Sequence, residues 1–303
     1  MTIDVGSAAR PADLAAAAFA ALAAEFFEED GSPIRFELRD KRQTQDDPFD
    51  EHVAAVLSAR LPESVKVFGS AGPLISPDVV LARQEETALL LRGGGEPDSR
   101  HVIGIEVKKL NSTGAGRAAR ATGMDYNSTP PCQTIKVETE AGRELRVPAT
   151  YLFVELVLVE SNEFYLRSLA LVAGSALNED VELYDRITGV RQKAIGLGTY
   201  GDGLDRQRPM LVFANPLGWD WLQDAATLIH PTGGLDDEQD LELRRTMVRT
   251  TTDGDKRTFG CYRLRESPGH PLPDAVAPFR TSRNRRTETT QRGRFRISLA
   301  RER

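Results

Sequence analysis

The sequence predicts an α/β fold in which helices flank a mixed β-sheet. Two helical patterns near the N-terminus are followed by several short apolar segments that favour strands. The strongest of these segments, 151–159, is almost entirely apolar, as is typical of a strand buried on both faces. Of the 303 residues, 40% are hydrophobic, which is enough for a substantial core. Helices mixed with strands in this way indicate an α/β domain.

The first helix is expected over residues 11–30 and the second between residues 48 and 62. Apolar residues in the first segment follow the spacing of one helical face: Ala15, Phe19, Leu22 and Phe26. This spacing predicts an amphipathic helix on the surface. Because the segment contains Glu25 and ends in acidic residues, it resembles neither a signal peptide nor a membrane span. We therefore expect a cytoplasmic protein with no membrane partner.

Short strands are expected at residues 65–68, 78–82, 88–92, 101–108, 151–159, 164–172 and 209–214, with weaker β patterning at 257–265. The Gly-rich turn at 93–98 returns the chain into 101–108, so residues 86–108 are predicted to form a hairpin. Segment 164–172 is the expected partner of 151–159, and a helical segment follows at 176–187. The two cysteines, Cys132 and Cys261, match no zinc spacing and fit a reducing compartment.

One charged motif ends an apolar strand. Glu106-Val107-Lys108 is the only Asp/Glu-x-Lys triplet in the chain and closes the apolar run that starts at His101. Side chains alternate along a strand, so Glu106 and Lys108 share one face while Val107 points to the core. Asp78, preceded by proline, stands at the head of another apolar segment. If these two strands are neighbours, two carboxylates and one ammonium converge at the edge of a sheet.

This arrangement suits the hydrolysis of a phosphodiester. Asp78 and Glu106 are the expected ligands of Mg²⁺, with the main-chain carbonyl of Val107 as a further ligand. Lys108 is expected to orient or deprotonate the attacking water and to offset charge in the transition state. Two alternatives stay open: Asp98 competes with Asp78 for the first carboxylate, and the triplet can be an ordinary salt bridge on an edge strand.

Pro77-Asp78 followed by Glu106-Val107-Lys108 resembles the PD-(D/E)xK nuclease superfamily. The downstream block 123–132, with the strand pair after it, resembles a type II restriction endonuclease. The resemblance implies a restriction-endonuclease-like core with a mixed central β-sheet flanked by helices. It also implies Mg²⁺-dependent cleavage of double-stranded DNA at a specific sequence, leaving 5′-phosphates. A homodimer is the usual assembly, and a cognate DNA methyltransferase is the expected functional partner in a restriction-modification system.

On this basis residues 1–230 are expected to form the nuclease domain with its N-terminal helices. Residues 231–303 are expected to form a C-terminal extension whose basic tail is a candidate DNA contact. Many members of the superfamily add an acid from a preceding helix, and Glu51 lies in such a helix. The alternative for Glu51 is a solvated surface acid.

Residues 111–136 are poor in periodicity and are expected to form a long loop beside the catalytic strand. Polar side chains in this segment are candidates for reading DNA: Arg117, Arg120, Asn127, Gln133 and Lys136. Arginine can pair with guanine through two hydrogen bonds, and Asn or Gln can pair with adenine in the same way. The alternative is a surface loop that holds no DNA.

Positive charge is unevenly distributed along the chain. Residues 280–303 carry a net charge of +7, whereas the remainder carries −13. This asymmetry favours contact with phosphate, and the alternative is a solvated tail. Residues 256–265 are a candidate for a second basic surface, from Lys256, Arg257, Arg263 and Arg265 interleaved with Phe259 and Tyr262, and the alternative is an ordinary solvated face.

Two other functions remain open from the sequence. One is a nuclease of the same superfamily that acts in repair or recombination and recognises DNA structure or damage. The other is a non-catalytic DNA-binding module on a nuclease-like scaffold. The presence of all three expected residue types, Asp78, Glu106 and Lys108, counts against a decayed catalytic site.

Overall fold

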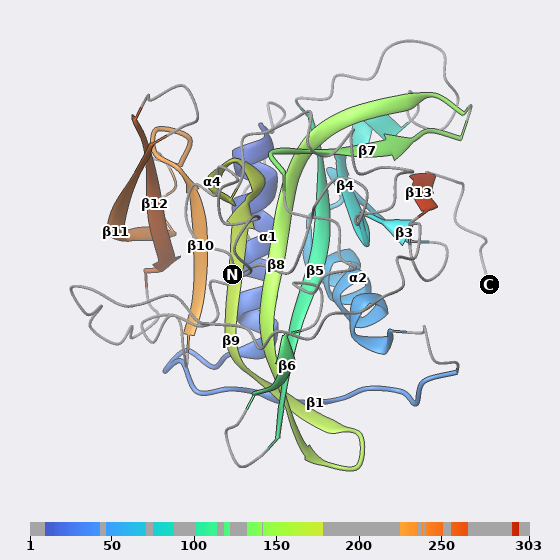
Figure 1. Cartoon of the computed structure of the whole chain (residues 1–303), viewed down its shortest axis with the longest axis vertical. Coiled ribbons are helices and arrows are strands. Elements are labelled where there is room, and N and C mark those ends of the chain that lie inside the picture. Colours follow the sequence, from blue (N-terminus) through green and yellow to red (C-terminus); the bar gives the residue numbers. More distant parts are fainter. Residues whose placement is uncertain are drawn as a thin grey trace, which may run out of the picture.

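A long mixed β-sheet forms the centre of the described chain, with strand β8 near its middle (Figure 1). This computed structural model describes residues 10–42, 47–70, 75–87, 101–113, 118–121, 132–140, 142–177, 225–235, 238, 240–250, 256–265 and 293–296. The main strands run in the order β11-β12-β10-β9-β8-β5-β4-β2. Their bounds are β2 (Val65–Gly69), β4 (Val79–Arg83), β5 (Val102–Thr113), β8 (Glu144–Glu160), β9 (Glu163–Ala173), β10 (Ala225–Pro231), β11 (Leu241–Thr250) and β12 (Lys256–Leu264).

Two neighbouring pairs in this order are parallel, β5 with β8 and β9 with β10, and the others are antiparallel. The predicted α/β class with a mixed sheet is therefore confirmed. The predicted pairing of 151–159 with 164–172 is also confirmed, as the antiparallel pair of β8 and β9. Strands β11 and β12 fall in the expected C-terminal extension, and they continue the sheet beyond β10. The predicted strands 88–92 and 209–214 lie outside the described residues.

A group of short strands lies beside the beginning of β8. β7 (Thr134–Glu138) pairs with the first residues of β8, and β13 (Gly293–Arg296) runs parallel to both β7 and β3 (Ile75–Ser76). β1 (Arg35–Glu37) pairs with β9, and β6 (Ala118–Ala121) pairs with β5. The expected loop at 111–136 is thus wrong in part, since it contains the end of β5 together with β6 and β7. Backbone pairing of β6 with β5, and of β5 and β7 with β8, outweighs the weak strand pattern of these residues.

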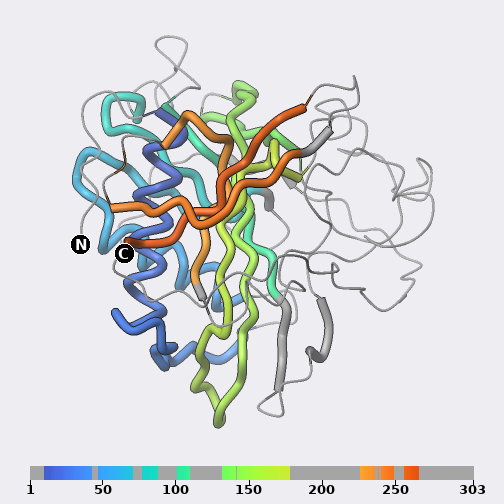
Figure 2. Tube along the Cα trace, turned by 90° about the vertical axis from the view of Figure 1, so that its left-hand side faces the viewer, coloured from blue at the N-terminus to red at the C-terminus, as the bar shows by residue number. Residues whose placement is uncertain are grey.

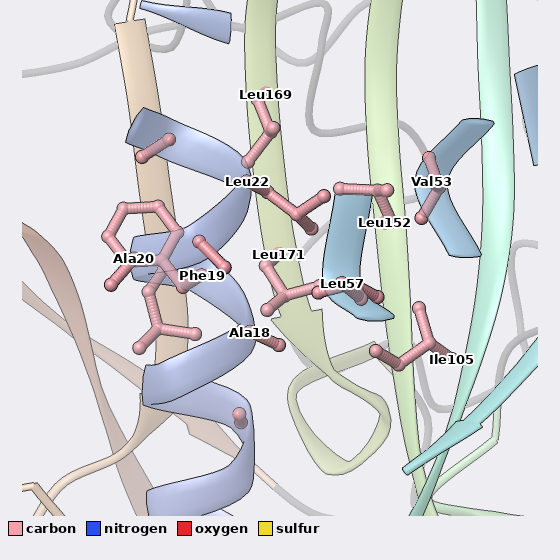
Figure 3. Packing of buried hydrophobic residues seen from close by; sticks show 14 of the residues in the cluster. Ala18, Phe19, Ala20, Leu22, Val53, Leu57, Ile105, Leu152, Leu169 and Leu171 are labelled. Atoms are coloured by element: carbon pink, nitrogen blue, oxygen red, sulfur yellow. The ribbon is translucent and has the colours of Figure 1, made fainter. Parts of the chain in front are cut away.

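Two helices, α1 (Pro11–Phe26) and α2 (Pro48–Arg60), cover one face of the sheet, and both lie on its left in Figure 2. A short helix, α4 (Gly174–Leu177), follows β9, and the rest of the helix predicted at 176–187 lies outside the described residues. In Figure 3, Leu22 of α1, Leu57 of α2 and Leu171 of β9 point into the space between helices and sheet. Among the described residues, no helix has the length and apolar character needed to cross a bilayer.

The predicted surface position of the first helix is wrong. Every residue from Leu14 to Ala23 in α1 is buried, which leaves the helix no solvent-facing side over this stretch. The helix packs against α2, β5, β9 and β10, and Leu241 and Tyr262 of the outer strands belong to the same core. Its many alanines carry small side chains, so neighbouring elements can approach it closely on several sides.

The two faces of β5 differ in what they contact. Ile103, Ile105 and Val107 belong to the core beneath the helices, as predicted for Val107. The intervening residues Glu106 and Lys108 lie on the opposite face of the sheet. Both cysteines, Cys132 and Cys261, are buried and free.

Candidate active site

The antiparallel pair of β4 and β5 brings the two parts of the predicted motif together. Val79 lies opposite Ile105, and Val80 lies opposite Gly104. One step further along both strands, Asp78 is level with Glu106. β4 forms an interior strand because its residues 79–82 are all buried and apolar. The condition on which the site depended, that the strand starting at Asp78 lies beside the triplet, is confirmed.

Asp78 is held by hydrogen bonds on both its side chain and its backbone. Its Oδ2 accepts a hydrogen bond from the backbone N–H of Val107 at 2.7 Å. Its backbone carbonyl accepts one from the N–H of Ser70 at 2.9 Å. Such bonds fix the carboxylate, which is only partly buried, against the strand that carries the triplet. A residue in a strand directs its N–H and C=O toward the same neighbour, so the carbonyl of Val107 faces the side of Asp78.

Glu106 and Lys108 form an ion pair within the structure. Lys108 Nζ donates a hydrogen bond to Glu106 Oε1 at 2.9 Å, and each residue is only 1% exposed. Burial lowers the pKa of Lys108 to about 8, although the charges of Asp78 and Asp50 favour its charged form. The lysine therefore loses its proton far more readily than an ordinary surface lysine does.

The beginning of α2 supplies acidic groups that sequence reasoning did not assign to this region. Lys109, on the opposite face of β5 from Lys108, forms ion pairs with Asp47 and with Asp50, the latter at 3.5 Å. Asp47 is also the N-cap of α2, since its side chain accepts a hydrogen bond from the N–H of Phe49. The helix start is thus tied to β5. The acid-Pro pattern at 47–48 is a capping signal that could have located this contact.

Glu51 forms an ion pair with Arg39. Its side chain is 58% exposed, and its carboxylate accepts a hydrogen bond from Arg39 Nε at 2.9 Å. These surroundings agree with the alternative for Glu51, a solvated surface acid. Asp98 lies outside the described residues.

The candidate DNA-reading residues are only partly described. Arg117 and Asn127 lie outside the described residues, and Arg120 is described only as the backbone partner of Asn111 in the β5–β6 pair. Gln133 is partly buried ahead of β7. Lys136 forms an ion pair with Glu144 at 2.8 Å, so part of its charge is balanced within the β7–β8 pair. Base contact by these residues stays a prediction.

The candidate basic surface at residues 256–265 is wrong in part, because Arg263 does not lie on the surface. Phe259 and Tyr262 are buried, and Arg263 is only 2% exposed. These side chains lie inside because β12 is an interior strand between β10 and β11. The exposed basic residues of this segment are Lys256, Arg257 and Arg265.

The donors at the site fit a magnesium ion. Mg²⁺ is usually bound by one or two carboxylates, with water and substrate phosphate completing its shell. Asp78, Glu106 and the carbonyl of Val107 provide oxygen donors of this kind from adjoining backbone positions. Among the residues that the structure describes, no three His, Cys, Asp or Glu side chains are close enough to hold a metal by themselves. The oxygen donors named above are of the type that Mg²⁺ prefers.

No family model, curated protein or solved structure matches this chain. The functional argument therefore depends on the fold and on the geometry of the site.

Proposed function

We propose that this chain is a type II restriction endonuclease of the PD-(D/E)xK superfamily with a restriction-endonuclease-like core. It hydrolyses double-stranded DNA at a specific sequence, depends on Mg²⁺ and leaves 5′-phosphates. One observation carries the proposal: Asp78 bonds to the backbone N–H between Glu106 and Lys108, while those two side chains bond to each other. Two acids and one lysine from adjacent strands are thus gathered into one site.

The proposed roles follow from the chemistry of each group. Asp78, Glu106 and the Val107 carbonyl would hold Mg²⁺, and the bound ion would supply stabilisation of charge on the phosphate and activation of a water molecule. Lys108 stands beside Glu106 and, with a pKa of about 8, can accept a proton from the attacking water at mildly alkaline pH. In its charged form it offsets negative charge that develops on the phosphate.

The proposal extends to the assembly and the setting of the enzyme. Two symmetric active sites are needed to cut both strands of a palindromic site, so we propose a homodimer. A cognate DNA methyltransferase would protect the same sequence, and both proteins would act in the cytoplasm.

The burial of Glu106 and Lys108 favours one alternative. With each residue 1% exposed, the pair can serve as a structural contact in a non-catalytic DNA-binding module. A repair or recombination nuclease would use the same catalytic groups, but it would recognise DNA structure and would give no discrete fragments from intact plasmid DNA.

Replacement of Asp78 separates these possibilities. Asp78→Asn keeps an oxygen that can accept the hydrogen bond from Val107 N–H, whereas Asp78→Ala removes it. We expect Asp78→Ala to lose about 1–3 kcal/mol of stability and Asp78→Asn to lose less. Both variants should lose at least about 100-fold in Mg²⁺-dependent cleavage of a long mixed-sequence DNA, because both lack the carboxylate charge. DNA binding should remain largely intact.

Glu51→Gln is the matched control, since it also removes one acidic charge but lies in an exposed pair with Arg39. It should cleave like the wild type. Sequencing of fragment ends then identifies the recognition site. Wild-type cleavage by Asp78→Asn would show that Asp78 only caps the backbone of β5, and the catalytic assignment would be wrong.

A further inference from the structure

Strand β13 brings part of the Arg-rich C-terminal region beside the strand that leads into Asp78. Gly293 lies opposite Ile75, and Arg294 lies opposite Ser76, in parallel register. Ser76 comes two residues before Asp78, so β13 lies beside the residues that lead into Asp78. On its other side β13 pairs with β7, where Arg296 lies opposite Glu138. A segment more than 200 residues distant in sequence thus reaches the head of the PD motif.

Strand β7 connects this group of strands to the triplet itself. A Cβ at Gly104 would lie 2.5 Å from Ile135 Cγ2 of β7 and 3.0 Å from Pro77 Cγ. Ile135 and Pro77 therefore pack directly on Gly104, which is two residues before Glu106 and on the same face of β5. Figure 1 shows β13 between β3 and β7 on the side of the sheet where β4 lies. Together β3, β7 and β13 flank the candidate site.

Electrostatics explains why a basic strand is useful at this place. Asp78 is acidic, and the chain outside residues 280–303 carries a net charge of −13. Negative charge of this kind repels a DNA backbone, which carries about one negative charge per 1.7 Å of duplex. Arginine binds phosphate through two parallel hydrogen bonds and keeps its charge at any working pH. Strand β13 contains two arginines in four residues and directly follows Arg292.

We infer that β13 forms the side of the active site that binds phosphate. Arg294 and Arg296 bind the DNA backbone next to the cleaved phosphodiester. The inference rests on the proposed nuclease function and assigns a part of the substrate to a part of the chain.

The test compares two double variants that remove the same charge. Arg294→Gln with Arg296→Gln changes β13, and Arg301→Gln with Arg303→Gln changes the tail outside it. Binding of a duplex of about 30 base pairs is measured in Ca²⁺, which replaces Mg²⁺ to prevent cleavage, over about 50 to 200 mM salt. For each protomer bound, loss of two phosphate contacts should make the slope of log K against log salt shallower by about 1.8 and weaken binding roughly 60-fold near 0.1 M salt. The tail control should change both values much less.

Lysine replacements at 294 and 296 keep the positive charge and should restore most of the affinity, which separates lost phosphate contact from lost folding. Equal salt slopes for the two Gln double variants, with an active wild type, would overturn this inference and leave the nuclease proposal standing. Faster cleavage by the β13 variant would also overturn it, because the strand would then be inhibitory. A wild type that neither binds nor cleaves DNA would remove both proposals.

Discussion

Glu106 and Lys108 should be far more costly to remove one at a time than together. The pair is buried, and Lys108 Nζ bonds to Glu106 Oε1 at 2.9 Å. Replacing one member leaves the other as an unpaired charge inside the protein, whereas replacing both by apolar groups of similar size leaves no charge at all. The relevant variants are Lys108→Met, Glu106→Leu and the double variant that carries both.

The size of each effect follows from the cost of neutralising the remaining group. In Lys108→Met, the protein can avoid a buried charge by protonating Glu106, which costs roughly 4 kcal/mol at pH 7 for a carboxyl of ordinary pKa near 4.3. In Glu106→Leu, removing the proton of Lys108 costs roughly 4–5 kcal/mol at pH 7 for an ordinary pKa near 10.4. The free energy of unfolding of the double variant should equal that of the wild type or exceed it by up to about 4 kcal/mol.

Urea unfolding at several pH values measures these differences. In Lys108→Met, burial would raise the pKa of Glu106 in the folded state, so the loss of stability should be small near pH 4 and should grow as the pH rises to 7. All three variants should be inactive in DNA cleavage. A double variant destabilised by the sum of the two single effects would refute the reasoning, because the two groups would then not act as a buried pair.

Three further outcomes are expected. The wild type should become more stable, relative to the double variant, as the pH rises from about 8 toward 10.5. Burial lowers the pKa of Lys108 to about 8, so the unfolded chain binds more protons than the folded chain in this range. Urea midpoints at several pH values measure this difference. Gly104→Val should lose about 1–3 kcal/mol of stability in thermal unfolding and should reduce cleavage, because a Cβ at this position lies 2.5 Å from Ile135 Cγ2. The control Gly69→Ala should be nearly neutral, because its Cβ meets only Ala54 Cβ at 3.4 Å. Tyr151→Phe should cost about 1–3 kcal/mol in the same measurement, because Tyr151 Oη accepts a hydrogen bond from the buried N–H of Cys132 at 2.9 Å.

The contact within the charged triplet 106–108 could be predicted from the sequence because its geometry is local. Residues two apart on a strand share a face, so the approach of Glu106 to Lys108 follows from their spacing alone. The position of Asp78 needed one further assumption, that two apolar strands near in sequence pair with each other. That assumption is met because residues 79–82 are apolar on both faces and fit an interior strand.

Other features depend on contacts between distant segments and had no local signal. The helical spacing in α1 indicated one apolar face, yet the helix is surrounded because β10, β11 and β12 extend the sheet around it. The pairing of β13 with β3 joins residues near opposite ends of the chain, and its short Arg-rich sequence has weak strand propensity. Tertiary contacts determine both outcomes, and spacing within one segment does not reveal them.

The surroundings of the triplet argue that it is present for chemistry. On its face of the sheet, Glu106 lies in one row with Tyr151, Val172 and Ile229, and Lys108 lies in the next row with Phe153. All four of these neighbours are buried and apolar or aromatic. Apolar residues at positions 106 and 108 would fit these surroundings and would avoid the desolvation of an ion pair. The attraction within a buried ion pair seldom offsets that desolvation cost. A charged pair at this point, with a second carboxylate bonded to the backbone between its members, is costly for folding, which supports its proposed role in holding a metal ion and a water molecule.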